Sequence, residues 1–485
     1  MKSQPVRRRV PRTPLRALLG SALILLAGTG SSTAAPGPGA LDASFGAKGV
    51  VLQSLGNGSD TTAAVASQAD GKLLVVGTST STVSGTTSKN IVVERFTAAG
   101  KLDGSFGAGT NDGSPDGVAS LSLGDGEEQG ADIAVQADGK ILVLGTTTSV
   151  NGSANVVVAR LNADGSLDKG FGKSADGTPD GVVNLDLGNG NDAAGGLAVL
   201  ANGKIAVSAT SSSSSGSNVE VVRLNADGSL DKSFGADSAD GSPAGFVSLS
   251  LGKGDDTAAD LAVQADGKLV VAANTTSTDA AGSSNIVLAR LTSSGALDGS
   301  FGTAKDGTVD GLVNLSLSDG NDTADALALQ ADGKILVVGS THSSTGRNAA
   351  VARFNTNGEL DSSFGRSRDD GTPEGVVGIS LGSGDDDGAA VALQADGRIL
   401  IAGTTTSLGG STNVFVARLA PNGAPDASFG VTADGTPDGF VNVSFSNGND
   451  SAAGLLIQPD GKIVVAGDSV TATGHDIALA RLLAR

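Results

Sequence analysis

Short apolar runs separated by polar turns fill the chain after its N-terminal region. Between Phe171 and Phe234, for example, four such runs occur, at 182–187, 196–200, 205–210 and 218–224. Each run is rich in Val, Ile and Leu and is bounded by Gly, Asn, Asp, Ser or Pro, which is the pattern of β-strands of ordinary length. No segment after the N-terminal region shows a sustained apolar period of 3.6 residues. The pattern therefore predicts an all-β structure.

This four-run unit repeats seven times along the chain. Its most regular mark is a Phe in the phrase Ser-Phe-Gly or a near copy, 61 to 67 residues after the previous one: Phe45, Phe106, Phe171, Phe234, Phe301, Phe364 and Phe429. Four strands per repeat and seven repeats predict a seven-bladed β-propeller of four-stranded blades, in which radial closure leaves only short strand edges. The competing repeat fold is a β-solenoid, but its coils have roughly 20–30 residues, about half this period.

The order of the strands within a blade follows from the polarity of the runs. An Asp-Gly turn between two apolar runs, as at 136–140, is a strong hairpin signal. The run 141–145 is apolar on both faces and suits a central strand, whereas 312–317 alternates and suits an outer strand. With this phase the first outer strand, 49–55, has no blade of its own. We predict that it pairs with 477–482, so that the N-terminal and C-terminal strands share one blade and close the ring.

The repeated phrases resemble the delta-60 repeat family of bacterial β-propeller proteins. The resemblance rests on LDASFG at 41–46, QADGKILV at 136–143, VARLNADGSLD at 158–168 and their copies, and it covers almost the whole chain after the N-terminal region. It implies an exported or surface propeller and transfers no catalytic residue. Segments of the form Asp-Gly-Thr-Pro-Asp-Gly, as at 176–181, depart from the shorter repeats of that family.

The N-terminus has the order of a secretory signal peptide. Six basic residues precede the apolar stretch 17–28 and a run of small residues. A stretch of this length is too short to span a bilayer. We expect residues 1–34 to be the signal peptide, 35–40 a short linker and 41–485 the propeller domain. We further expect a monomer without a membrane span that is secreted, periplasmic or on the cell surface.

Charge and aromatic content narrow the range of partners. The formal net charge is −19, and residues 1–34 hold six positive charges and no acidic residue, which leaves −25 on the remainder. Such a surface disfavours nucleic acid and favours cations or basic partners. The chain has no Trp and no Tyr, so it lacks the usual faces on which bases and sugars stack. It also has no Cys, which excludes disulfides.

A ring of carboxylates is the candidate metal site. In every repeat an acid stands five residues after the last apolar residue of the outer strand: Asp60, Glu128, Asp192, Asp256, Asp322, Asp386 and Asp450. On the predicted phase these acids lie on the loops from each outer strand to the next inner strand, where hard oxygen ligands would suit Ca²⁺. No complete EF-hand loop or tandem nonapeptide is present. The alternative is that each acid accepts local backbone N–H groups, as in an Asx-turn.

One Arg recurs in the third strand of every repeat: Arg95, Arg160, Arg223, Arg290, Arg353, Arg418 and Arg481. Six of these seven are followed eight residues later by an Asp, from Asp103 in the first repeat to Asp426 in the sixth. We interpret this pattern as a structural ion pair between neighbouring loops. A residue that serves every repeat equally is poor evidence for a single active site.

Catalysis has little support in the sequence. The two histidines, His342 and His475, lie in polar loops without a visible catalytic partner, and Cys and Tyr are absent. We therefore expect an exported, non-catalytic binding or surface-structural propeller whose ligand is a protein or a cation-bridged polymer, with Ca²⁺ as a candidate ligand. The alternative is a metal-dependent hydrolase or lyase with its site in the central channel. A symmetry-breaking His, Arg or Lys at the mouth of that channel would favour the enzyme.

Overall fold

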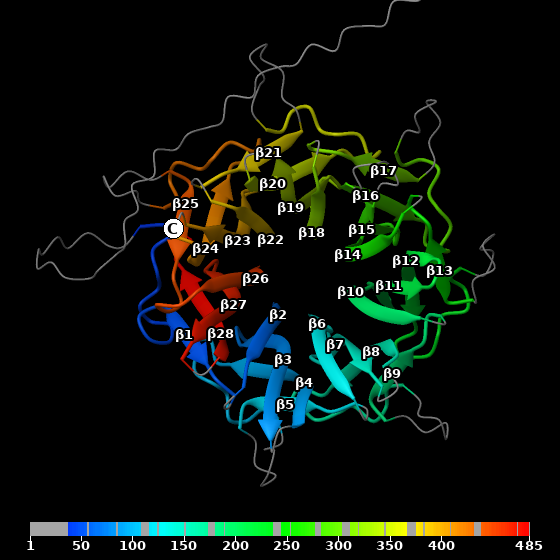
Figure 1. Ribbon diagram of the computed structural model, residues 1–485, viewed down its shortest axis with the longest axis horizontal. Helices are drawn as coiled ribbons and strands as arrows, with labels where there is room; N and C mark the ends of the chain where they lie inside the picture. The colour runs from blue at the N-terminus through cyan, green and yellow to red at the C-terminus, as the bar shows by residue number, and fades with distance from the viewer. Residues whose placement is uncertain are drawn as a thin grey trace, which may run out of the picture.

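The structure is a computed structural model that describes residues 37–484, except for 56–57, 84–85, 108–115, 124–125, 150–151, 173–179, 189, 236–243, 253, 277–282, 303–310, 319, 344–345, 366–374, 382–383, 408, 431–437 and 473. The predicted signal peptide lies outside the described residues. The described chain forms 28 strands and no α-helix, so it contains no helix able to cross a membrane. Seven sheets of four antiparallel strands surround a common axis (Figure 1). The predicted seven-bladed β-propeller is thereby confirmed.

In the first six blades the chain runs from the inner strand to the outer strand. The first blade contains β2 (Asp60–Ser67), β3 (Leu73–Val83), β4 (Thr86–Phe96) and β5 (Val118–Leu121). The second contains β6 (Glu127–Val135), β7 (Ile141–Thr148), β8 (Ala154–Leu161) and β9 (Val182–Leu185). The third contains β10 (Asn191–Val199), β11 (Ile205–Ser213), β12 (Gly216–Leu224) and β13 (Phe246–Leu249). The fourth contains β14 (Asp256–Val263), β15 (Leu269–Thr276), β16 (Ser284–Leu291) and β17 (Leu312–Leu315).

The remaining blades have the same arrangement of strands. The fifth contains β18 (Asp322–Leu329), β19 (Ile335–Ser343), β20 (Gly346–Phe354) and β21 (Val376–Ile379). The sixth contains β22 (Asp386–Leu393), β23 (Ile399–Thr406), β24 (Thr412–Leu419) and β25 (Phe440–Val443). The seventh contains β26 (Asp450–Ile457), β27 (Ile463–Thr471), β28 (Gly474–Leu482) and, as its outer strand, β1 (Val50–Gln53) from the N-terminal end.

The seventh blade closes the ring with both ends of the chain, as predicted. Strand β1 runs antiparallel to β28, from the pair Val50–Ala480 to the pair Gln53–Ile477. A backbone hydrogen bond joins the two ends of the chain beyond these strands, since Gly39 N–H donates to the carbonyl of Leu483 at 2.7 Å. Figure 1 shows the blue β1 beside the red β28. The two ends of the described chain are therefore neighbours in space.

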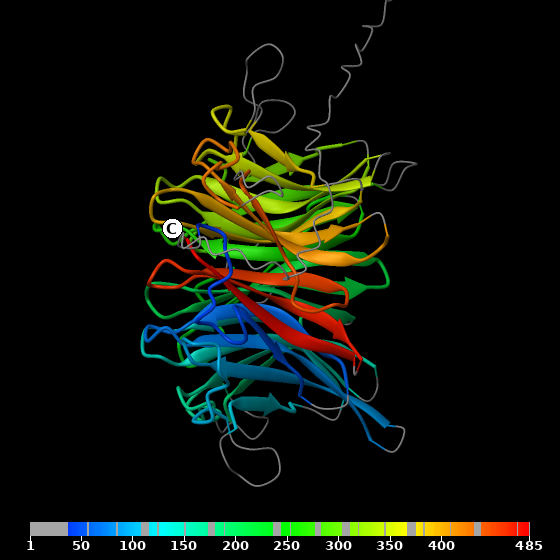
Figure 2. The same cartoon turned by 90° about the vertical axis from the view of Figure 1, so that its left-hand side faces the viewer.

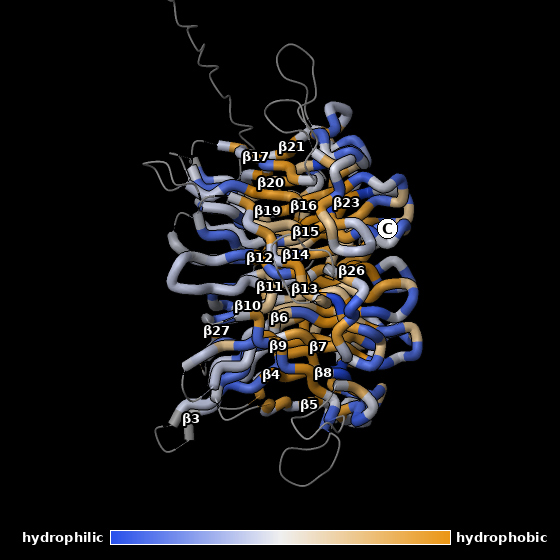
Figure 3. The backbone as a smooth tube through the Cα atoms, turned by 90° about the vertical axis from the view of Figure 1, so that its right-hand side faces the viewer, coloured by the Kyte–Doolittle hydropathy of each residue, from blue (hydrophilic) through white to orange (hydrophobic). Residues whose placement is uncertain are grey.

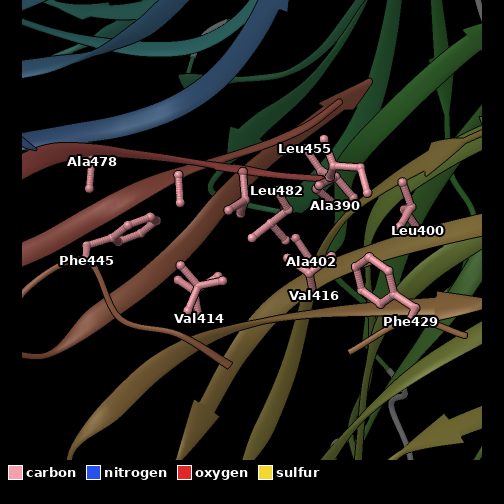
Figure 4. Close-up of a cluster of buried hydrophobic side chains, with 14 residues drawn as sticks. Ala390, Leu400, Ala402, Val414, Val416, Phe429, Phe445, Leu455, Ala478 and Leu482 are labelled. Carbon is pink, nitrogen blue, oxygen red and sulfur yellow. The ribbon is translucent and has the colours of Figure 1, made fainter. Parts of the chain in front are cut away.

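The apolar core lies between blades rather than within them. Successive side chains of a strand point to opposite faces, so each blade packs one face on the preceding blade and the other on the next. Between the sixth and seventh blades, Leu400, Val416 and Phe429 pack with Leu455 and Leu482 (Figure 4). Figure 2 shows the ring of blades from the side, and Figure 3 shows that hydrophilic residues gather on the loops at both ends of the ring. This two-sided packing explains why the second and third strands of each blade are apolar on both faces.

Every inner strand carries a β-bulge near its middle. In β18, for example, the pairing with β19 shifts register between Ala324 and Ala326, so that Asp325 is the extra residue. A bulge re-aims the side chains next to it. The residues at and just after the bulge are therefore the places where one blade can differ from the others without disturbing the strand pairing.

Candidate functional site

All seven acids of the predicted ring lie at the start of an inner strand. Asp60 is the first residue of β2 and Glu128 the second residue of β6, and the other five occupy one of these two places. No member of the ring exposes more than 1% of its surface. We call this end of the propeller, where the seven acids lie, the acid end. The opposite end carries the Asp-Gly turns and the seven recurrent arginines, and we call it the strut end.

The aspartates of this ring cap the loops that precede them. In Asp192, Oδ2 accepts the backbone N–H of Leu187, five residues earlier, at 2.8 Å. The same bond, at 2.6–2.9 Å, is made by Asp60, Asp256, Asp322, Asp386 and Asp450. The second oxygen of Asp60 accepts the hydroxyl of Ser79 at 2.6 Å. These contacts are those of the Asx-type alternative, in which the carboxylates satisfy buried backbone donors.

The ring does not gather its acids into one cluster. Among the residues that the structure describes, no three His, Asp or Glu side chains are placed to hold one metal ion. Binding of Ca²⁺ by this ring therefore stays a prediction.

Each recurrent Arg ties its own loop to the next blade. Arg223 Nε lies 2.6 Å from Asp231 Oδ2, the guanidinium carbon lies 4.5 Å from the centroid of the Phe234 ring, and Nη1 donates to the carbonyl of Ser293 in the next blade. Lys204 reaches the same Asp231 oxygen at 2.7 Å. The other six repeats show the same ion pair, cation–π contact and bond to the next blade. The predicted structural ion pair is confirmed.

The seventh arginine pairs with an Asp near the N-terminal end of the described chain. Arg481 pairs with Asp42, with 2.9 Å between Nη2 and Oδ2, and stacks over Phe45. No Asp follows Arg481 in the sequence, so the spacing of eight residues did not reveal this pair. The available signal was the position of the Asp relative to the recurrent Phe, because Asp42 stands three residues before Phe45, as Asp103 does before Phe106.

The ring acids and the recurrent arginines occur once in every blade, so a site that is present only once must lie where the repeats differ. The residue four places after each ring acid, at or just after the bulge of the inner strand, is such a place. It is Ala or Gly in five blades and an Asp in two; in blade order these residues are Ala64, Asp132, Gly196, Asp260, Ala326, Ala390 and Gly454.

Asp132 and Asp260 lie on either side of the third blade's inner strand, β10. Asp132 Oδ2 accepts the backbone N–H of Leu197 at 2.8 Å. A Cβ added to Gly196 would lie 2.7 Å from Asp260 Oδ1, so this glycine leaves room for the carboxyl group. Burial raises the pKa of Asp132 to about 6. Burial and the negative charge of Asp132 raise the pKa of Asp260 to about 7.

A second departure from the symmetry lies at the acid end between the fifth and sixth blades. Asp325 stands at the bulge of β18, where the other blades carry Ala or Gly. Arg347, opposite His342 in the hairpin β19–β20, places Nη1 3.3 Å from Asp387 Oδ1. Burial and the charge of Asp387 raise the pKa of Asp325 to about 7, and Arg347 opposes this effect. Asp325 is nevertheless an exposed residue, so water screens these interactions and weakens their effect on its pKa.

Four of these residues, Asp132, Asp260, Asp325 and Arg347, were not predicted from the sequence, although the signal was present. Aligning the seven repeats on their recurrent Arg places Arg347 opposite Ala154, Ser217, Ser284 and Thr412 in other blades. Lys89 and His475 occupy the same place in the first and seventh blades. Charged residues at an otherwise small or polar position mark departures from the symmetry, and such departures locate a site better than repeated residues do.

We predict that stability is greatest near pH 4 and falls in both directions. Although burial opposes it, hydrogen bonds from Lys140, Gly170 N–H and Arg160 lower the pKa of Asp168 to about 2, so the stability it contributes is lost as pH falls from 3.8 towards 2. Asp132 and Asp260 have raised pKa values, so their contribution is present below 3.8 and is lost as pH rises to about 6 and 7. Calorimetric melting between pH 2 and pH 9 checks this.

The double variant Asp132→Ala, Asp260→Ala should reduce the loss of stability on the alkaline side of that profile and leave the acid side unchanged. Alanine occupies the same place in the first, fifth and sixth blades, so the scaffold should tolerate it. A melting temperature that rises steadily from pH 4 to pH 8 in the unmodified chain would contradict the prediction.

Comparison with known proteins gives one family and several distant structural likenesses. A family model described as a domain of unknown function (DUF5122) β-propeller matches residues 68–106, 136–171, 200–234, 264–301, 330–364, 394–429 and 458–484. No curated protein matches the chain. Each matched segment begins at or just before an Asp-Gly or Asn-Gly turn, and six of the seven end at the Phe under the recurrent Arg.

Three solved structures illustrate the likeness of shape. Semaphorin 2a of Drosophila is 10% identical with a TM-score of 0.48, over 90% of this chain and 75% of that one. The polysaccharide lyase Uly1 is 11% identical with a TM-score of 0.48, over 87% and 90%. The soluble aldose sugar dehydrogenase of Escherichia coli is 13% identical with a TM-score of 0.36, over 90% and 100%. At these values the three structures carry no functional argument for this chain.

Proposed function

The chain belongs to the DUF5122 β-propeller family, and on that premise we propose that it is an exported, non-catalytic binding module that takes a cationic ligand at its inner strands. The observation that carries this proposal is the pair of inner-strand carboxyl groups, Asp132 and Asp260, at positions where the other blades have Ala or Gly. The acidic surface of the chain supports the same choice of ligand, because it attracts cations over a distance.

The electrostatics of the pair give the binding mode. Asp132 raises the pKa of Asp260, so the two carboxyl groups oppose each other's ionisation. A cation held between or beside them removes that opposition and favours both charged forms. Binding near neutral pH should therefore release protons. The same linkage predicts tighter binding at pH 8 than at pH 5.

Calorimetric titration of residues 35–485 with Ca²⁺ and, separately, with spermidine tests the proposal. We expect saturable heat from one of these probes, and a heat that changes between buffers of different ionisation enthalpy because protons are released. Asp132→Ala with Asp260→Ala should weaken binding by at least tenfold, the effect of losing about 1.4 kcal/mol.

The double variant Asp70→Asn, Asp138→Asn is the matched control for charge. It removes two acids from exposed Asp-Gly turns at the strut end, where the third blade already carries Asn202. This variant should bind as the unmodified chain does. No heat from either probe up to millimolar concentration, or equal weakening by the control, would overturn the proposal.

The enzyme alternative has one observation in its favour. Arg347 is a symmetry-breaking cation at the acid end, and the raised pKa of the nearby Asp325 suits a group that exchanges protons at neutral pH. If product formed from an acidic polysaccharide, and this activity were lost in Asp325→Asn, a hydrolase or lyase would replace the binding module as the proposed function.

A further inference from the structure

The interface between the seventh and first blades differs from the other six. It lies beside the blade that closes the ring, and we call it the closing seam: β2–β5 on one side, and β26–β28 with β1 on the other. Ten buried apolar residues form its core, whereas the other interfaces contain twelve to fourteen. Fewer apolar contacts at one interface make that interface the easiest to open.

Polar substitutions account for the smaller core. On the outer strand β1, Gln53 occupies the place that is a buried Leu, Ile or Val in the other six outer strands, such as Leu185 in β9 and Leu315 in β17. On β4, Glu94 occupies a place that is Ala or Val in every other repeat, such as Ala159, and its neighbours across the sheet are Val75 and Val118.

Glu94 is fully buried in this interface. Its exposed fraction is 0%, and neither carboxylate oxygen has a hydrogen-bond partner among the described residues. It lies on the same face of β4 as Val92 and Phe96, which belong to the core of the closing seam. A buried, unpaired carboxylate is strongly unfavourable when charged and far less so when protonated.

The other charged groups of the closing seam do not neutralise Glu94. Asp60 of β2 lies near enough to raise the pKa of Glu94 further, in addition to the larger effect of burial. On the seventh blade, Asp468 accepts the backbone N–H of Thr62 at 2.5 Å, and His475 lies near Asp468. Arg481, which also faces this seam, is already paired with Asp42 at the strut end.

Asp468 adds a second departure from the symmetry at the same seam. The matching residues of the other blades are Thr, Asn or Ser, and Thr78, Thr146 and Thr210 use a neutral hydroxyl for the same bond to the next inner strand. At the two positions held by Glu94 and Asp468 the closing seam thus carries carboxyl groups, whereas the other seams carry none.

We propose that the closing seam is a proton-dependent closure, in which protonated Glu94 keeps the first and seventh blades together and its ionisation lets them separate. The separation would expose β1, β28 and the inner edge of β2 while the other blades stay paired. This inference does not depend on any ligand, so it stands or fails independently of the proposed binding function.

The pH range of the effect follows from linkage. Glu94 has its ordinary pKa of 4.5 when the seam is open and a pKa well above that when it is closed. Between those two values the equilibrium constant for opening should rise by up to tenfold per pH unit. Below pH 4.5 the closure should be independent of Glu94.

Hydrogen exchange at single-residue resolution, between pH 5 and pH 8, tests the proposal on the chain 35–485. After correction for the intrinsic rate at each pH, protection in β1, β28 and β2 should fall with rising pH by up to tenfold per unit. Protection in β15–β17, on the far side of the ring, should change less. Glu94→Ala, which restores the residue found in five other blades, should abolish the difference between the two regions.

Two further variants keep the test decisive. Glu94→Gln keeps the shape without the charge and should also lose the pH dependence, even if the buried amide lowers overall stability. In a chain without any Cys, Leu52→Cys with Ala478→Cys lies on directly paired residues of β1 and β28, close enough for a disulfide. That disulfide lies within the seventh blade and does not cross the seam, so its oxidation should leave the pH dependence of protection in β2 unchanged.

Two results would overturn the proposal. One is equal pH dependence of protection in the closing seam and in β15–β17. The other is a seam-specific pH dependence that persists unchanged in both Glu94→Ala and Glu94→Gln.

Discussion

A chain that lacks residues 1–57 should no longer fold as a cooperative ring. It loses the outer strand of the seventh blade, and with it Asp42 and Phe45, the partners of Arg481. Arg481 is 4% exposed, and removing one partner of a buried pair costs about 3–5 kcal/mol. Loss of a buried Phe costs about as much again. Together these losses are comparable with the whole stability of a typical domain, about 5–15 kcal/mol.

The expected observation, monitored by circular dichroism, is the loss of a single sharp melting transition or a melting temperature lower by about 6–10 °C, because the melting temperature of a chain of this length falls by roughly 1 °C per kcal/mol. The matched control is a circular permutant that carries residues 37–57 after residue 484, joined by a short Gly-Ser linker. The bond between Gly39 N–H and the carbonyl of Leu483 shows that these ends are adjacent, so the permuted strand can dock in place.

The permutant should melt within a few degrees of the full chain, because it restores every contact of the lost segment. A truncated chain that melts as sharply and as high as the permutant would contradict the prediction. That outcome would mean that six complete blades and one three-stranded blade suffice for a stable ring.

Phe301→Ala should lower the free energy of unfolding by about 3–5 kcal/mol. Phe301 is fully buried in the core between the fourth and fifth blades, and the Arg290 guanidinium carbon lies 4.4 Å from its ring centroid. The turn of the next repeat also packs on this ring, since a Cβ added to Gly358 would lie 3.0 Å from Phe301 Cε2. The substitution therefore leaves a cavity and removes the face on which the guanidinium stacks, a contact worth about 0.5–2 kcal/mol.

Chemical denaturation measures this effect, with Leu297→Ala as the control. Leu297 stands four residues earlier in the same loop and is 42% exposed, so its truncation should change stability by no more than about 0.5 kcal/mol. The same substitution at Phe171 or Phe234 should cost a similar amount, because each lies under its own Arg in the same way. If Phe301→Ala lowered the free energy of unfolding by less than about 1 kcal/mol, the prediction would be wrong, and the loop held by Arg290 would not need the Phe301 ring.

Much of the architecture could be predicted because the same sequence pattern occurs seven times along the chain. A single apolar run is ambiguous, but seven copies with the same spacing and the same Asp-Gly turn leave few folds that accommodate them. The polarity of the runs also placed the strands within a blade. The alternation in 312–317 marked an outer strand, and this placement predicted the pairing of β1 with β28 that the structure contains.

The candidate site was harder to predict, because a side chain's role depends on what surrounds it. The acids of the ring were recognised as a set, but whether Asp192 faces water, a cation or a backbone N–H is decided by the position of Leu187. The partner of Arg481 was missed for a related reason. Asp42 lies 439 residues away in the chain, and only the closure of the ring brings the two together.

The repeat unit, the all-β class, the number of blades and the sharing of the last blade by the two ends were all readable from the amino-acid sequence. These properties follow from periodic local patterns, which act within a few residues and are the same in every copy. Three-dimensional packing was needed to establish which charged groups are buried, which are paired, and that Glu94 is neither exposed nor bonded among the described residues. Burial and pairing depend on side chains that neighbouring blades contribute from distant parts of the chain.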